Sequence, residues 1–120
     1  MEILSLPGDE NTPKVMMDKK NEIFEISGRS LPEDASKFYN PLLEWIKAYI
    51  LEPNPSTEFV FKLEYVNNGS SKRILDVISA LEDTKGAKIL WYFHEDDEDM
   101  EETGEEFAEL VKIPFEFKTY

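Results

Sequence analysis

The sequence predicts an α/β fold, a single domain with one mixed β-sheet and three main helices in the order βββ-α-β-α-β-α-β. Apolar residues alternate or run together in short segments that predict strands, and they recur at spacings of three and four in longer segments that predict helices. The second half of the chain alternates strands with helices, and such β-α-β crossovers join parallel neighbours right-handedly. The 120 residues suit one domain over residues 1–120.

The first third of the chain predicts three short strands. Glu2–Leu6 is the first, because a cluster of turn-forming residues at 7–11 must end it. Lys14–Asp18 and Glu22–Ser27 are both prone to form strands. The polar residues 19–21 between them have the length and composition of a tight turn, so the two strands are expected to form a hairpin.

A first helix follows this hairpin. Ser30 and Glu33 have the spacing of a capping box, in which each side chain satisfies a free backbone N–H at the helix start. The helix should stop before Pro53, and Pro41 interrupts it, which predicts either a kink or two shorter helices with Asn40 capping the second. Apolar residues at spacings of three and four form one stripe along it: Phe38, Leu42, Trp45, Ile46 and Tyr49.

The middle of the chain predicts a strand, a loop, a helix and a second strand. Thr57–Val66 alternates aromatic and aliphatic residues and should be long and largely buried. The polar residues Asn67–Ser71 then turn the chain into the helix Lys72–Asp83, which has helical apolar spacing. The near-continuous apolar run Ala87–Phe93 is typical of an interior strand that is covered on both faces.

The last third predicts one more helix and one more strand. The acidic run Glu95–Glu102 leads into a helix at Gly104–Lys112, and Gly104 leaves the start of that helix uncertain. Ile113–Lys118 alternates apolar residues after Pro114, which suits a strand start or an edge strand.

Composition excludes several classes of function. The chain has 13 basic and 26 acidic residues and a net charge of −13, so it should repel nucleic acid and anionic membrane surfaces. It has no cysteine, and His94 is its one histidine, which excludes thiol chemistry and any multi-histidine metal site. No segment is long and apolar enough to span a membrane, and the acidic N-terminal residues do not resemble a signal peptide. We therefore expect a cytoplasmic protein that uses no cofactor.

One loop has the position of a binding or regulatory site. Asn67, Asn68, Gly69, Ser70, Ser71 and Lys72 lie between the C-terminal end of a strand and the N-terminus of a helix. Open α/β sheets place ligands there, and the helix dipole favours a negative group. The spacing of a phosphate-binding P-loop is absent. Ser70 or Ser71 could cap the helix, or could accept a phosphate group that switches the surface.

Three other features are weaker candidates. The acidic run lacks the ligand spacing of a calcium loop, so a solvated helix start that attracts a basic partner is the preferred interpretation. His94 directly follows a strand, but nothing in the sequence places a nucleophile beside it. Arg29 precedes the first helix and could bind a phosphate or a carboxylate, or could pair with Glu33 or Asp34.

Several motifs in order resemble the bacterial SiaC family of regulatory phosphoproteins. The resemblance covers nearly the whole chain, from Thr12-Pro13 to Ile113-Pro114-Phe115. Five segments carry it: ISGRSLPEDA at 26–35, FYNPLLEW at 38–45, LEYVN at 63–67, SSKRILD at 70–76 and WYFHEDDEDM at 91–100.

The resemblance implies a STAS-like fold, similar to that of anti-anti-sigma factors, and a non-enzymatic role in partner switching. In that role a SiaB-like kinase adds a phosphate, a PP2C-type phosphatase removes it, and the unmodified protein binds and activates a diguanylate cyclase. The acceptor threonine of the family falls on Asn68 and the serine after it on Gly69. Asparagine cannot accept phosphate, which leaves Ser70 and Ser71 as candidate acceptors.

Two other functions stay open on the sequence alone. One is a constitutive protein-binding adaptor that is never phosphorylated, which Asn68 favours. The other is an enzyme or a small-ligand-binding domain that uses His94 and the acidic run. The absence of cysteine, of a second histidine and of a cofactor motif argues against this last function.

Overall fold

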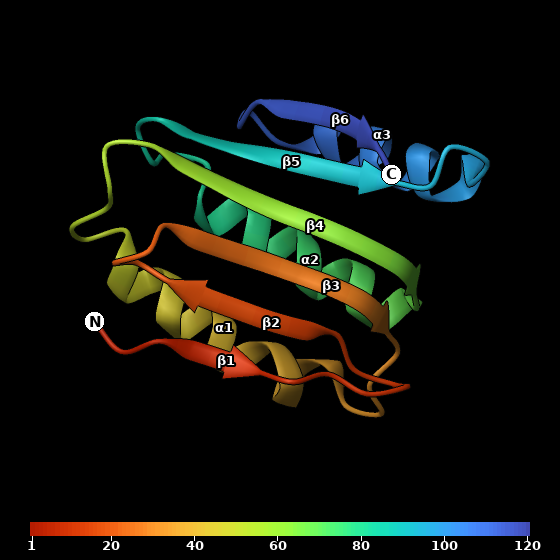
Figure 1. Cartoon of the computed structure of the whole chain (residues 1–120), viewed down its shortest axis with the longest axis horizontal. Coiled ribbons are helices and arrows are strands. Elements are labelled where there is room, and N and C mark those ends of the chain that lie inside the picture. The colour runs from red at the N-terminus through yellow and green to blue at the C-terminus, as the bar shows by residue number, and fades with distance from the viewer.

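The computed structural model describes all residues 1–120, and it confirms the predicted order of elements (Figure 1). The strands are β1 (Leu4–Leu6), β2 (Lys14–Asp18), β3 (Ile23–Ser30), β4 (Thr57–Val66), β5 (Ala87–Phe93) and β6 (Phe115–Thr119). The helices are α1 (Ala35–Tyr49), α2 (Asn68–Ala80) and α3 (Glu98–Leu110).

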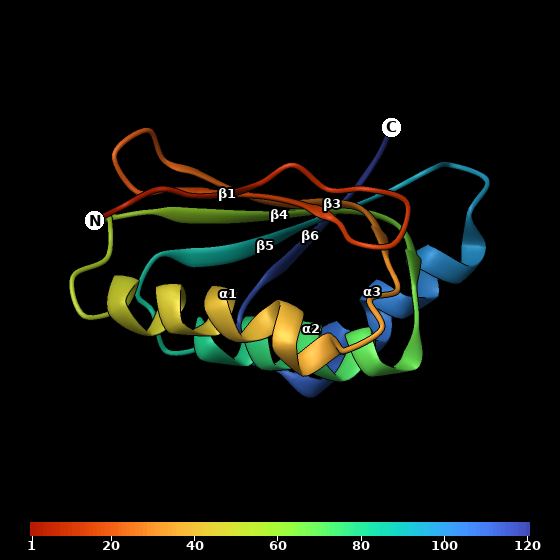
Figure 2. The ribbon, with the colours of Figure 1, turned by 90° about the horizontal axis from the view of Figure 1, so that it is seen from below.

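The six strands form one mixed sheet whose spatial order is the chain order, β1 to β6. β1, β2 and β3 are antiparallel neighbours, which confirms the predicted hairpin, and β3 to β6 are parallel. Each parallel connection contains one helix, and all three helices lie on the same face of the sheet (Figure 2). The domain therefore has two layers.

The second face of the sheet carries no helix, so the prediction that Ala87–Phe93 is covered on both faces is wrong. On that face Lys88 lies 3.2 Å from a carboxylate oxygen of Glu58 and 3.4 Å from one of Glu116. These ion pairs and the long side chain of Tyr92 cover the neighbouring apolar atoms, and Leu90 is buried among them without a second layer. β5 is nevertheless an interior strand of the sheet, since it lies between β4 and β6.

The hydrophobic core lies between the sheet and the helices. Its centre is Trp91, a fully buried ring that packs against Phe61 and Phe107. The indole N–H donates to the carbonyl oxygen of Met100 at 3.0 Å, so the ring is fixed both by packing and by a hydrogen bond. The core contains no side-chain nitrogen or oxygen that is buried without a hydrogen-bond partner.

Helix α1 differs from the prediction at its start and at its proline. Asp34, not Ser30, caps it, and its carboxylate accepts from the backbone N–H of Lys37 at 3.1 Å. The helix continues through Pro41, so a division into two helices with Asn40 as a cap is wrong. Four buried residues on both sides of Pro41 hold the helix on the sheet, which offsets the lost hydrogen bond: Tyr39, Leu42, Ile46 and Tyr49.

The other two helices begin earlier than predicted. α2 starts at Asn68, so most of the predicted loop before Lys72 is the first turn of the helix. α3 starts at Glu98, so five of the eight residues of the acidic run are helical and Gly104 lies inside the helix. The first turn of α2 is polar, and that of α3 contains Met100 as its one apolar residue, so the apolar spacing used for the predictions begins only later in each helix.

Candidate functional site

The N-terminus of α2 lies at the carboxyl end of β4, as the sequence predicts for the candidate loop. Asn67 is its N-cap residue. The side-chain Oδ1 of Asn67 accepts from the backbone N–H of Ser70 at 2.8 Å, and its carbonyl oxygen accepts from the N–H of Ser71 at 3.0 Å. Its own N–H donates to the carbonyl oxygen of Ser30 at 2.9 Å. These bonds fix the helix start to the end of β3.

The six predicted site residues divide between surface and interior. Asn68, Gly69 and Lys72 are exposed, and Asn67 and Ser71 are half-buried. Ser70 is fully buried. The first turn of α2 therefore presents an amide, a bare stretch of backbone and an ammonium group to solvent, with the Ser71 hydroxyl at the edge.

Ser70 belongs to a buried row of three hydroxyl groups. The Ser30 and Ser70 oxygens are 2.9 Å apart, and the Ser30 and Tyr39 oxygens are 2.5 Å apart. The row joins the end of β3, the first turns of α1 and the first turn of α2. It replaces apolar packing with directional contacts at the point where three elements meet, and so fixes their relative positions.

Burial raises the pKa of the Tyr39 phenol to about 12, although its hydrogen bonds with Ser30 and Ser70 act in the opposite direction. The phenol is therefore neutral at physiological pH. Each neutral hydroxyl group can donate one bond and accept another, so a row of three is satisfied without any charge. The exposed first turn of α2 is thus supported from inside by uncharged hydroxyl groups that are all hydrogen-bonded.

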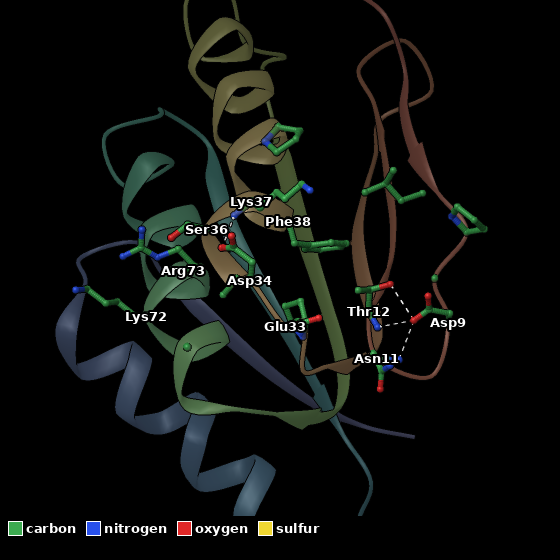
Figure 3. Close-up of a pocket in the computed structure, with 17 residues that line it drawn as sticks. Asp9, Asn11, Thr12, Glu33, Asp34, Ser36, Lys37, Phe38, Lys72 and Arg73 are labelled. Atoms are coloured by element: carbon green, nitrogen blue, oxygen red, sulfur yellow. Dashed lines mark hydrogen bonds between the residues drawn. The ribbon is translucent and has the colours of Figure 1, made fainter.

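A groove of about 1300 Å³ lies beside this helix start (Figure 3). Its walls come from the segment between β1 and β2, the first turns of α1 and the first turn of α2. Figure 3 shows Asp9, Asn11 and Thr12 on one side and Lys72 and Arg73 on the other.

Charged residues of both signs line the groove. Three of them are acidic and three are basic: Asp9, Glu33, Asp34, Lys37, Lys72 and Arg73. Hydrogen bonds from the backbone N–H groups of Asn11 and Thr12, at 2.8 Å each, lower the pKa of Asp9. Asp9 therefore organises its own loop. Arg73 is held 3.2 Å from Asp76 on the next turn of α2.

The weaker candidates lie apart from one another. His94 follows β5, and its Nδ1 is 3.1 Å from the carbonyl oxygen of Tyr120, whose ring lies against the imidazole. Asp97 caps α3, and the carboxylates of the next residues lie in its first turn. Arg29 makes no ion pair with Glu33 or Asp34; its guanidinium lies 5.4 Å from the ring centre of Tyr65 on the open face.

The structure holds no group of three or more histidine, aspartate or glutamate side chains placed to bind one metal ion. None of its three helices has the length and apolar character that crossing a membrane requires.

Two features of this region could not be found by sequence reasoning. Tyr39 is not part of the apolar stripe predicted for the first helix, and its hydroxyl partner is Ser30, 9 positions away along the chain. Ser30 in turn bonds to Ser70, which is 40 positions further on. The groove combines segments near residues 10, 35 and 70, and its shape depends on how they pack. The only local signal was the loop after Val66.

The first turn of α2 is an exposed helix start on a small α/β domain, and the hydrogen bonds of Asn67 hold it in place. No nucleophile and base lie together on it.

Comparison with known proteins identifies the family of this chain. The model of the family described as SiaC family regulatory phosphoprotein matches residues 6–120. A protein of Pseudomonas aeruginosa (strain UCBPP-PA14) is 24% identical over 124 residues, which span 100% of this chain and 98% of that protein. The chain belongs to the SiaC family of regulatory phosphoproteins.

Solved structures show the same fold. Apo-SiaC from Pseudomonas aeruginosa superposes with a TM-score of 0.89 at 24% identity, over 98% of this chain and 99% of that one. A second structure is the diguanylate cyclase SiaD in complex with its activator SiaC, also from Pseudomonas aeruginosa. It matches with a TM-score of 0.91 at 24% identity, over the same shares of both chains.

Proposed function

We propose that this chain binds and activates a diguanylate cyclase of the SiaD type, and that it does so as a non-enzymatic partner. The observation that carries the proposal is its membership of the SiaC family over residues 6–120, together with the complex in which a protein of this fold is the activator of SiaD. The cytoplasmic location that the sequence predicts is part of the same proposal.

The contact surface in this proposal is the first turn of α2, with Asn68, Gly69 and Lys72 as the residues that reach the partner. Asn67 and Ser70 act from inside, because their hydrogen bonds hold the turn in place. A preorganised surface of this kind loses little entropy on binding, which favours affinity.

Regulation is proposed to act on the same turn. Ser70 is fully buried and bonded to Ser30, so a kinase cannot reach its hydroxyl without unfolding the helix start. Ser71 is half-buried one residue further on, and we propose it as the acceptor. A phosphate there would add about two negative charges beside the contact residues and would be favoured by the helix dipole. A SiaB-like kinase and a PP2C-type phosphatase are the expected enzymes.

One observation favours a second candidate, a constitutive activator that is never phosphorylated. The position of the family acceptor threonine holds Asn68, which is exposed at the first residue of α2. In this case the protein would keep the contact surface and would lack the switch.

Phosphorylation by the cognate kinase with ATP, followed by intact-mass and fragment-ion analysis, separates the two candidates. The regulated form predicts phosphate on Ser71, its loss in Ser71→Ala and its retention in Ser70→Ala. The constitutive form predicts no phosphate on the wild type and new phosphate on Asn68→Thr. Dominant phosphate on Thr103 or Ser56 would contradict both.

Binding is tested by the affinity of the purified cyclase for the wild type and for Asn68→Asp. The added charge should weaken binding, whereas a negative charge at a helix N-terminus is neutral or stabilising by about 0.3–1 kcal/mol. Lys20→Asp, in the exposed hairpin turn, is the control and should leave affinity unchanged. If Lys20→Asp abolishes binding and Asn68→Asp does not, the contact surface is elsewhere.

A further inference from the structure

The two edges of the sheet differ in how they are protected. β1 has only three residues, and the indole N–H of Trp45 donates to the carbonyl oxygen of Glu2 at 2.8 Å just before it. A short edge strand offers little to an incoming strand. β6 is longer and forms the opposite edge, with no element beyond it (Figure 1).

The unpaired backbone groups of β6 follow from its register with β5. Pro114 accepts from the N–H of Ile89, and the N–H of Tyr120 donates to Phe93, so these two residues face β5. In a parallel pair, alternate residues face the neighbouring strand. The N–H and C=O groups of Phe115, Phe117 and Thr119 therefore point outward from the sheet.

The side chains at this edge are both apolar and charged. Phe117 is 39% exposed beside Phe115, and Leu110 at the end of α3 is 67% exposed. Glu116 and Lys118 alternate with these rings and so lie on the open face of the sheet. Lys118 makes no ion pair within the chain, while Glu116 is 3.4 Å from Lys88 and has a second carboxylate oxygen.

We propose that β6 pairs antiparallel with β6 of a second copy of this chain, with the two-fold axis at Phe117. The outward-facing groups of Phe117 then bond to those of the partner's Phe117, and those of Phe115 bond to those of the partner's Thr119. Glu116 of each copy lies opposite Lys118 of the other. The sequence FEFKT is thus complementary to itself in both charge and apolar contact, which identifies a second copy as the occupant.

The pairing joins two sheets into one continuous sheet. The mode is strand addition, in which main-chain hydrogen bonds give affinity and alternate side chains give the register. It uses the edge formed by β6, two strands away from β4 and the start of α2, so the proposal does not depend on the proposed function.

Sedimentation of the purified chain over micromolar to high-micromolar concentrations tests the proposal, at an ionic strength that screens the net charge. The wild type should dimerise. Lys118→Glu places two carboxylates opposite each other at two points and should raise the dimer dissociation constant by at least about tenfold. The double variant E116K/K118E restores both pairs and should return the constant to within about threefold of the wild type.

Two further variants show whether a loss of the dimer comes from the β6 edge or from a general change in charge or folding. Lys20→Glu makes the same charge change in the hairpin turn and should leave the dimer unaffected. Thr119→Pro removes an outward N–H that β5 does not use and should abolish pairing, with an unchanged thermal midpoint showing that the fold is intact. A wild type that stays monomeric throughout would overturn the proposal, and so would equal weakening by Lys118→Glu and Lys20→Glu or no recovery in the double variant.

Discussion

Two helical glycines, Gly104 in α3 and Gly69 in α2, should respond in opposite directions to the same change to alanine. A Cβ on Gly104 would clash with Nε1 of Trp91 and would lie 2.5 Å from its Cδ1, closer than real Cβ atoms come to other heavy atoms. A Cβ on Gly69 would meet only the Ala35 Cβ at 3.5 Å and Oδ1 of Asn67 at 3.9 Å, which are ordinary contacts.

The loss of unfolding free energy expected for Gly104→Ala follows from the contacts that the Trp91 ring would lose if it moved. Trp91 is fully buried and cannot move away without disturbing Phe61 and Phe107, at an overpacking cost of about 1–3 kcal/mol. A shift would also break its bond to the carbonyl of Met100, and a buried unpaired N–H costs about 1–3 kcal/mol. Replacing glycine by alanine inside a helix returns about 1 kcal/mol, so the net loss is about 1–5 kcal/mol.

Gly69→Ala keeps the helical gain without a clash, so it should raise the free energy of unfolding by about 0.5–1 kcal/mol. Chemical denaturation of both variants and the wild type, followed by tryptophan fluorescence and circular dichroism, gives the two differences. If Gly104→Ala is as stable as the wild type, the packing of α3 against Trp91 described above is incorrect. A destabilised Gly69→Ala would show that the α2 start is more tightly enclosed than the structure indicates.

Three further predictions concern capping and titration. Asn67→Ala removes the acceptor for the N–H of Ser70 and should lower the unfolding free energy by about 0.5–2 kcal/mol, as measured by urea denaturation. Burial raises the pKa of Tyr39 to about 12, so the folded protein holds this proton after the unfolded chain has lost it, and stability should fall by about 2–3 kcal/mol between about pH 10 and 12. Urea denaturation at several pH values measures this fall in stability, and Tyr39→Phe should not show it because phenylalanine has no proton to lose. Hydrogen bonds from the side chain and the backbone N–H of Asn21 lower the pKa of Asp18, which makes a stabilising contribution above pH 3.8 that is lost as the pH falls through the folded-state pKa. Asp18→Asn should therefore show a smaller loss of stability than the wild type between neutral and acidic pH.

The order of elements could be predicted because each core strand and helix carries its own apolar period. The stripe on α1 and the alternation in β4 are local patterns, and the structure buries Leu42, Ile46 and Tyr49 of the stripe. In β4 the alternation holds for Phe59, Phe61 and Leu63. It is wrong for Tyr65, which is exposed because the register with β3 shifts just before it. Helix starts are different, because their polar first turns resemble loops until the cap is known. Asn67 and Asp34 are the observed caps, and several nearby polar residues could have served equally well.

What the sequence could not show depends on packing between distant segments. The Ser30 hydroxyl, which has the spacing of a helix cap, instead bonds to Ser70 and Tyr39 in the interior. The burial of Ser70 follows from that contact, and it decides which of two adjacent serines is accessible. The sequence did not predict the open face of β5 for a similar reason, because the carboxylates that pair with Lys88 come from β4 and β6.

Cyclase activity tests the central claim most directly. A purified diguanylate cyclase of the SiaD type is supplied with GTP, and its formation of cyclic diguanylate is measured with increasing amounts of this chain. We predict a saturable rise in rate with the wild type and Lys20→Asp, and a rise shifted to higher concentrations with Asn68→Asp. A cyclase rate that no concentration of the folded wild-type chain changes would contradict this prediction.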